Sequence, residues 1–121
     1  MRLGLKPEGG FAESPYAFTE ADLLRGKALY QSFCAICHGA RGEGDGRAIP
    51  LGVPKPRSYH DPAVRDQPEG YFYFAATNGF GRMLPYKSRI PERERWLIAH
   101  YIKRCLLSEA CPEEVVHAEV H

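Results

Sequence analysis

Glycine and proline interrupt the middle of this chain so often that no long helix or strand fits there. Nine of the 24 residues from 39 to 62 are Gly or Pro, and proline neither continues a helix nor donates a hydrogen bond to a sheet. The whole chain of 121 residues contains 12 Gly and 10 Pro, which excludes a coiled coil or a simple helical bundle and disfavours a regular sheet. We therefore expect one domain in which a long wrapped loop separates a few helices.

Three helices are predicted around this loop. The first covers about residues 20–34, because Thr19 and Asp22 resemble a capping box and apolar side chains then recur every three to four positions. A short helix covers about 68–78 and stops at an Asn-Gly pair that suits a left-handed helix end. The last helix covers about 91–105, with a proline in its first turn and acidic residues near its positive end.

The apolar composition is too thin to build a core by itself. Leu, Ile, Val and Phe together supply 26 residues, about 21% of the chain, which is close to the level below which a chain buries too little apolar surface to fold. A small, loop-rich domain of this kind usually needs a disulfide, a metal or a cofactor. The formal net charge of +1 lacks the basic excess of a dedicated nucleic-acid-binding protein. No stretch approaches the roughly 20 apolar residues of a membrane span, and the N-terminus lacks the apolar core of a signal peptide.

Residues 34–38 point to the missing cofactor. The run Cys34-Ala35-Ile36-Cys37-His38 is the attachment signature of c-type haem, in which two thiols add to the porphyrin vinyl groups and the adjacent histidine binds the iron. Cysteines three positions apart reach two neighbouring vinyl groups from one side. The porphyrin also supplies the apolar mass that the composition lacks. We therefore expect one covalently attached haem c on Cys34 and Cys37, with His38 as an iron ligand.

Two other uses of the cysteines are weaker. A thioredoxin-like Cys-x-x-Cys pair needs a strand-to-helix context, whereas a glycine-rich loop follows it here. Zinc held by Cys34 and Cys37 would need two more ligands from Cys105, Cys111 or the remaining histidines. Cys105 and Cys111 are six positions apart and do not form the closely spaced second pair of a typical zinc site.

Met83 is the predicted second axial ligand. It is the only methionine apart from Met1, and it lies in a segment bracketed by glycines and a proline, off any helical stripe. Imidazole also binds haem iron well, so four other histidines compete for this position: His60, His100, His117 and His121. Ligation by His38 and Met83 would fill both axial positions, which favours electron transfer over oxygen binding or activation. No catalytic motif of another kind is present, so we expect a carrier and not an enzyme.

From about Leu23 to Leu107 the chain resembles the class I monohaem cytochromes c. The matching positions are Gly26, Tyr30, Cys34 to His38, Gly39, Gly42, Gly44-Asp45-Gly46, Asn78-Gly79, Met83, Pro85-Tyr86 and Leu97 to Ile102. The phrase Thr77-Asn78-Gly79-Phe80-Gly81-Arg82-Met83, followed by Tyr86, Ile90-Pro91 and Arg95-Trp96, is similar to the monohaem cytochrome subunit of alternative complex III, a quinol-oxidising respiratory assembly.

This resemblance implies an all-α cytochrome c fold, with about three main helices, short helices and long loops wrapped around the haem. The first and last helices would cross at Gly26 and an aromatic residue such as Tyr101. A proline carbonyl would accept the Nδ1 hydrogen of the histidine ligand, with Pro54 preferred over Pro56 and Pro50. Three further side chains would reach the haem propionates, unless the tyrosines belong to the core and the arginine to the solvent: Tyr59, Arg65 and Tyr71.

The expected organisation is an irregular N-terminal arm over 1–18 packed on the body, a cytochrome c domain over 19–108 and a C-terminal tail over 109–121. Haem c attachment in bacteria occurs on the exported side of the membrane, as the resemblance implies. That compartment is oxidising, which favours a disulfide between Cys105 and Cys111 over two free thiols. We expect the protein in the periplasm or at the outer face of the cytoplasmic membrane, with the export signal absent from this sequence.

The resemblance implies a one-electron carrier of a bacterial respiratory chain. It would be a monomer that takes electrons from a quinol-oxidising complex and passes them to a terminal haem-copper oxidase, with membrane association only through these partners or a lost anchor. Residues 39–90 hold eight basic and five acidic side chains, and such an excess steers acidic partners to a transient, salt-sensitive contact. The basic residues of this predicted docking face are Arg41, Arg47, Lys55, Arg57, Arg82, Lys87 and Arg89.

Two other functions stay open at this point. The chain would be a fixed haem subunit or domain of a larger respiratory complex if it does not exchange between partners. It would be a ligand-binding or peroxidatic haem protein if Met83 were absent from the iron or easily displaced.

Overall fold

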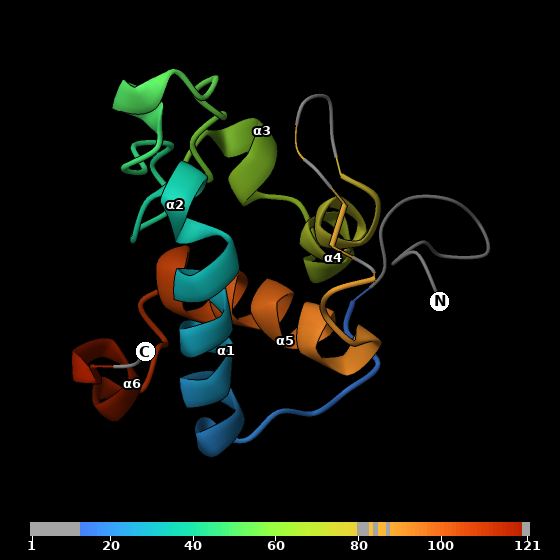
Figure 1. The fold of residues 1–121 in the computed structure, drawn as a ribbon. Helices are drawn as coiled ribbons and strands as arrows, with labels where there is room; N and C mark the ends of the chain where they lie inside the picture. The colour runs from blue at the N-terminus through green and yellow to red at the C-terminus, as the bar shows by residue number, and fades with distance from the viewer. Residues whose placement is uncertain (1–12, 80–82, 84, 87, 120–121) are drawn as a thin grey trace.

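Every regular element in the part of the chain that the structure describes is a helix. The structure, a computed structural model, describes residues 13–79, 83, 85–86 and 88–119. Its elements are α1 (Glu20–Phe33), α2 (Ala35–His38), the 3-10 helix η1 (Ile49–Leu51), α3 (Pro62–Arg65), α4 (Glu69–Asn78), α5 (Glu92–Tyr101), the π-helical turn η2 (Ile102–Leu106) and α6 (Glu113–His117), as Figure 1 shows. The predicted all-α fold is confirmed, with α1, α4 and α5 as its three main helices. None of these helices has the length and apolar character that a membrane span requires.

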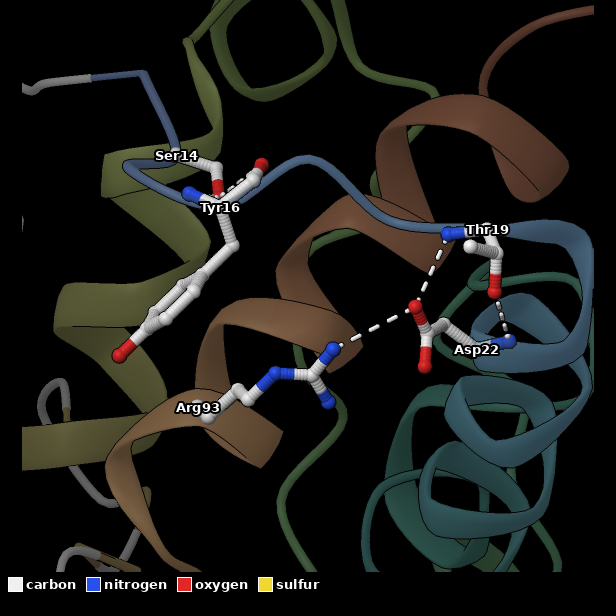
Figure 2. A network of polar contacts seen from close by, with 5 residues as sticks. All are labelled: Ser14, Tyr16, Thr19, Asp22 and Arg93. Atoms are coloured by element: carbon white, nitrogen blue, oxygen red, sulfur yellow. Dashed lines mark hydrogen bonds and ion pairs between the residues drawn. The ribbon is translucent and has the colours of Figure 1, made fainter.

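A capping box starts α1, as the sequence predicts. The Thr19 hydroxyl accepts a hydrogen bond from the Asp22 N–H at 3.1 Å, and the Thr19 N–H donates to the Asp22 carboxylate at 2.9 Å. Arg93 of α5 approaches the same carboxylate at 3.3 Å, so the cap also contacts the last long helix (Figure 2). The hydrogen bond from the Thr19 backbone N–H is the main reason that the pKa of Asp22 lies below its usual value. The start of α1 is therefore fixed both locally and against α5.

The helices α1 and α5 cross at Gly26. A Cβ atom built on Gly26 would lie 3.2 Å from Leu97 Cγ, Leu97 O and Tyr101 Cβ, so the backbones approach more closely than a larger residue permits. This crossing was predicted and is confirmed. Beside it α4 packs on α5, where the rings of Tyr73 and Trp96 stack with centroids 4.1 Å apart.

The end of α4 also follows the prediction. The helix stops at Asn78, and Gly79 follows with a positive φ of 74°. Its N–H still donates to Ala75 O at 2.8 Å. The helix therefore ends at a residue for which positive φ costs little, and the segment that carries Met83 starts there.

The C-terminal part of the chain packs against α1 through a helix that the sequence did not predict. Cys105 and Cys111 form the predicted disulfide, which turns the chain back after η2. The ammonium group of Lys27 in α1 then donates to the carbonyls of Val115, Val116 and Ala118 at 2.7, 3.0 and 2.8 Å. Val115 is fully buried. The expected tail over 109–121 is thus a docked helix in its described part, and Figure 1 shows α6 beside α1.

Residues 13–18 pack on α4 and α5. The Ser14 N–H donates to one Glu69 carboxylate oxygen at 3.2 Å, and the other oxygen pairs with Nδ1 of His100. The Phe18 and His100 rings lie 5.3 Å apart. Residues 1–12 of the predicted arm lie outside the described residues, and the boundaries 1–18, 19–108 and 109–121 stay predictions.

Candidate functional site

The two cysteines and the histidine of the 34–38 run lie on one short helical turn. Cys34 ends α1, with its N–H donating to Tyr30 O at 2.8 Å, and it also starts α2. The N–H groups of Cys37 and His38 both donate to Cys34 O, at 3.2 and 3.0 Å. A positive φ of 83° at Gly39 stops the turn. The sequence therefore folds the motif into a compact unit anchored on the last turn of α1.

The glycine-rich loop folds back against this turn and fixes its backbone. The N–H groups of Gly44, Gly46 and Ala48 donate to the carbonyls of His38, Cys37 and Ile36 at 2.8, 3.1 and 3.0 Å. A Cβ atom on Gly46 would overlap the Ile36 carbonyl, so the close approach requires glycine. The glycines of this loop, which exclude a long helix or strand there, thus also let the loop bond to the backbone of residues 36–38 and fix it.

Two adjoining cavities open beside the motif. The larger has a volume of about 520 Å³, and the smaller about 250 Å³. Both are lined by Cys34, His38, Pro56 and Met83, and the larger is also lined by Cys37. Its remaining wall is mainly apolar and comprises Phe33, Val53, Pro54, Lys55 and Tyr86. The structure therefore brings the distant Met83 to the same space as the cysteines and His38.

Tyr86 holds the Met83 side of the cavity against the cysteine side. Its N–H donates to Ala76 O in α4 at 2.8 Å, and its hydroxyl donates to Phe33 O at 3.3 Å. The Phe33 and Tyr86 rings meet edge to face, 5.9 Å apart. From the sequence, Tyr86 was only a matching position of the resemblance and Phe33 only part of the apolar stripe of the first helix. Their places three residues after Met83 and next to Cys34 were the signals that could have assigned both to the site.

Burial controls the protonation of the groups at this site. It lowers the pKa of His38 to about 4, which keeps the imidazole neutral and able to bind a metal. Burial, helped by the neighbouring Cys37, raises the pKa of the Cys34 thiol to about 12. The imidazole ring lies flat on Tyr59, with centroids 4.8 Å apart and 15° between the planes.

The hydrogen bond predicted between His38 Nδ1 and the Pro54 carbonyl is absent. This nitrogen is buried and has no hydrogen-bond partner among the described residues, and its ring is stacked on Tyr59. Pro54 lines the larger cavity, whereas the alternative Pro56 lines both. Pro54 therefore lies at the site, and its hydrogen bond to the haem-bound histidine stays a prediction.

The three residues predicted at the propionates separate into two groups. Tyr59 and Tyr71 line the smaller cavity, so both lie at the site. Arg65 lines neither of the two cavities. Its Nε pairs with Asp66 at 3.2 Å at the end of α3, where both side chains are largely exposed. Its exposed position fits the alternative that Arg65 belongs to the solvent, and a role at the propionates stays a prediction.

None of the described competing histidines lines either cavity. His60 bonds to Arg41 O at 2.8 Å, His100 to Glu69 and His117 to Glu113 at 3.0 Å. His121 lies outside the described residues. The disulfide also removes Cys105 and Cys111 as zinc ligands, and the described residues contain no group of three or more His, Cys, Asp or Glu side chains placed to hold a metal.

The residues present fit a covalently attached haem. Cys34 and Cys37 are free thiols on the wall of a largely apolar cavity whose volume falls in the range of about 300–1,000 Å³ that ligand sites occupy. The buried, unpartnered Nδ1 of His38 marks an imidazole that is incompletely satisfied by the protein. Met83 supplies a thioether in the same space, and imidazole with thioether is an axial pair that cytochromes c use.

Residues 21–102 match the family described as cytochrome C oxidase, cbb3-type, subunit III. A comparison with curated protein sequences found no match. Among solved structures, the chain is 27% identical to a chain of the Kuenenia stuttgartiensis reducing HAO-like protein complex, with a TM-score of 0.63 over 79% of this chain and 48% of that one. The chain thus spans about half the length of that neighbour.

Two further solved structures support the fold alone. The c-type cytochrome KustC0563 is 20% identical, with a TM-score of 0.55 over 69% of this chain and 98% of that one. Cytochrome cL from the marine methylotrophic bacterium Methylophaga aminisulfidivorans is 18% identical, with a TM-score of 0.52 over 89% of this chain and 73% of that one. Since the family match covers more than half of the chain, this protein belongs to the cytochrome c family of cbb3-type subunit III domains and carries covalently attached haem c with iron.

Proposed function

We propose that this protein is a one-electron carrier of a bacterial respiratory chain, acting in the periplasm or at the outer face of the cytoplasmic membrane. It would take electrons from a quinol-oxidising complex of the alternative complex III type and pass them to a terminal haem-copper oxidase. The observation that carries the proposal is the meeting of His38 and Met83 at one cavity beside Cys34 and Cys37. Two residues 45 positions apart in the chain would thereby both bind the haem iron.

The protein residues have separate tasks in this proposal. Bound haem c supplies reversible one-electron chemistry at its iron. Cys34 and Cys37 would hold the group through their sulfur atoms, and His38 and Met83 would bind its iron. An iron held by both of these residues would have no site left for oxygen, which favours electron transfer over oxygen activation. The apolar wall that includes Phe33 and Val53 limits the access of water.

The surface around the cavity suits a transient, charge-steered encounter. Five of the predicted basic residues are exposed in the described part: Arg41, Arg47, Lys55, Arg57 and Arg89. Arg82 and Lys87 lie outside the described residues. Ile36, Leu51 and Val53 are among the exposed large apolar side chains, with Leu51 84% exposed. A small apolar patch with basic neighbours provides contact area while the charges set the association rate.

The first experiment tests the Met83 ligand by optical spectroscopy of the haem-loaded protein in both oxidation states. The wild type is expected to show a low-spin c-type spectrum with the far-red band of methionine sulfur bound to ferric iron. Met83→Ala should lose this band, whereas His60→Ala, which removes an exposed competing histidine, should keep it. Absence of the band from the wild type, or high-spin iron, would refute His38 and Met83 ligation and favour a ligand-binding or peroxidatic role. Carbon monoxide binding to the ferrous wild type would also favour a ligand-binding or peroxidatic role.

A salt titration tests the docking face. Electron-transfer rates with membranes that contain the two partner complexes should fall as ionic strength rises. Lys55→Glu should lower the low-salt rate, while the control Arg25→Glu changes an equally charged residue of α1 that pairs with Glu94. Rates that do not depend on salt, or equal effects of the two variants, would contradict the proposed face.

A fixed haem subunit of a larger complex is the second candidate, and the description of the matched family as an oxidase subunit favours it. A subunit would co-purify with its complex in a constant ratio. A carrier would be recovered as a monomer that exchanges electrons with both complexes. Size-exclusion chromatography of gently solubilised membranes, followed by quantification of this chain, separates the two.

A further inference from the structure

Arg95 is a buried cation whose role the haem site does not explain. It lies in α5 with 8% of its surface exposed, and it lines neither cavity beside the motif. Burying a guanidinium is unfavourable unless its N–H groups find well-placed acceptors. The burial of Arg95 therefore calls for a structural reason.

Among the described residues, three neutral oxygens on different parts of the chain accept hydrogen bonds from the guanidinium. Its Nε donates to the Thr77 hydroxyl at 3.0 Å, its Nη1 to Ile90 O at 2.6 Å and its Nη2 to the Tyr73 hydroxyl at 3.1 Å. The charge also lies 5.3 Å from the centre of the Tyr73 ring. Only a planar fork with several fixed donors makes these contacts together, and a lysine ammonium does not reproduce that geometry.

The acceptors mark the two ends of the segment that carries Met83. Thr77 belongs to the last turn of α4, two residues before Gly79. Ile90 is the last residue before Pro91, the N-cap of α5. Arg95 therefore bonds to the chain where it leaves α4 and again where it returns to α5, and Met83 lies between these points.

We propose that Arg95 is a positioning residue for Met83: by joining the ends of the segment from 79 to 89, it holds the thioether at the cavity. The proposal rests on the proposed role of Met83 as an axial ligand. A neutral thioether that competes with other ligands would bind the iron in proportion to the population of conformations that place Met83 at the cavity. Joining the ends removes conformations in which Met83 points elsewhere.

The test compares Arg95→Met with Arg95→Lys and with the control Arg93→Met in the haem-loaded ferric protein. Arg93 lies in the same helix, but it is exposed and pairs with Asp22 at 3.3 Å, so its loss removes a cation without touching the Met83 segment. Added imidazole is the competing ligand, and its dissociation constant is measured from the loss of the far-red band. Denaturant titrations follow that band and the far-UV circular dichroism in parallel.

Loss of two or three hydrogen bonds from a charged donor predicts at least about tenfold tighter imidazole binding to Arg95→Met. Its far-red band should also disappear at a lower denaturant concentration than its helical signal. Arg95→Lys should fall between this variant and the wild type, and Arg93→Met should match the wild type. Wild-type imidazole affinity in Arg95→Met, or simultaneous loss of band and helix, would overturn the proposal and leave Arg95 with a merely structural role.

Two milder variants decide the question if Arg95→Met yields no folded haem protein. Thr77→Val and Tyr73→Phe each remove one acceptor and keep Arg95, and Tyr73→Phe also keeps the ring that stacks on Trp96. Tighter imidazole binding in either supports the proposal, and wild-type affinity in both overturns it. A wild type without the far-red band would overturn the proposed Met83 ligand and this inference together, whereas a normal wild type with unaffected variants overturns only the inference.

Discussion

Replacing Gly26 by alanine tests whether the α1–α5 crossing is as tight as the geometry indicates. The new Cβ would lie 3.2 Å from Leu97 Cγ, Leu97 O and Tyr101 Cβ, a few tenths of an ångström inside ordinary contact. Leu97 and Tyr101 are 1% and 4% exposed, and two of the three atoms belong to or adjoin the α5 backbone. The overlap is therefore relieved only if the helices move apart.

The sign of the effect depends on two opposing terms. An alanine inside a helix is favoured over glycine by about 1 kcal/mol, whereas inserting a methyl group into a well-packed contact costs roughly 1–3 kcal/mol. With about 2 kcal/mol for the second term, the free energy of unfolding should fall by about 1 kcal/mol. Gly26→Val adds two methyl groups and a β-branch, so its loss should be larger.

Denaturant unfolding of the haem-loaded protein, followed by far-UV circular dichroism, measures these differences. Gln31 is exposed on the same helix, so the pair Gln31→Gly and Gln31→Ala measures the glycine-to-alanine preference where nothing is crowded. The free energy of unfolding of Gln31→Ala minus that of Gln31→Gly is the gain expected for alanine at an uncrowded position. If Gly26→Ala raises the free energy of unfolding by the same amount, the crossing has room for a methyl group and the reasoning is wrong.

Three further predictions concern the rest of the fold. Lys27→Met removes the ammonium group that donates to three carbonyl oxygens in and after α6, so the free energy of unfolding should fall by about 3 kcal/mol. Limited proteolysis should then remove residues after 112, and protease resistance equal to that of the wild type would contradict this. Cys111→Ala opens the short loop closed by the disulfide, which should cost about 2 kcal/mol in thermal unfolding, and no change in midpoint would show that the bridge is dispensable. Burial raises the pKa of Tyr30, Tyr59 and Tyr101, that of Tyr101 to about 12. Above pH 10 the unfolded chain therefore loses tyrosine protons that the folded protein retains, and the free energy of unfolding falls by about 1.4 kcal/mol per pH unit for each tyrosine. Tyr30→Phe should reduce this slope by one tyrosine's share, and an unchanged slope would mean that its hydroxyl is not protected.

Much of the fold was predictable because its signals are local. The Thr19–Asp22 capping box and the glycine after α4 each depend on a few adjacent residues. The haem attachment run is a contiguous motif. Met83 was found by elimination, since it is the only internal methionine. The position of Gly26 at the helix crossing followed from the resemblance, and it depends on a single small residue facing an aromatic one.

The unpredicted features depend on contacts between distant residues. The helix α6 has five residues, too few to be stable alone, and it relies on Lys27, which is 88 positions from Val115. The contacts among Ser14, Glu69 and His100 also join residues that are far apart in the chain. Arg95 did leave a signal, because it precedes the buried Ile98 and Ile102 by three and seven positions and so places a cation on the apolar stripe of the last helix. That signal was missed, because Arg95 was noted only as a matching position of the resemblance.

The two proposed iron ligands are supported unequally, and this asymmetry bears on function. His38 lies within a covalent attachment motif whose turn is fixed by backbone bonds from Gly44, Gly46 and Ala48. Around Met83, the contacts of the described residues lie near the ends of the segment, where Tyr86 bonds to Ala76 and Phe33 and Arg95 bonds to Thr77 and Ile90. Because the turn of His38 is fixed by backbone bonds along its whole length, we expect Met83 to be the first of the two ligands lost on heating or in denaturant. A haem protein in which His38 leaves first would mean that the glycine loop, and not the Met83 segment, is the weaker side of the site.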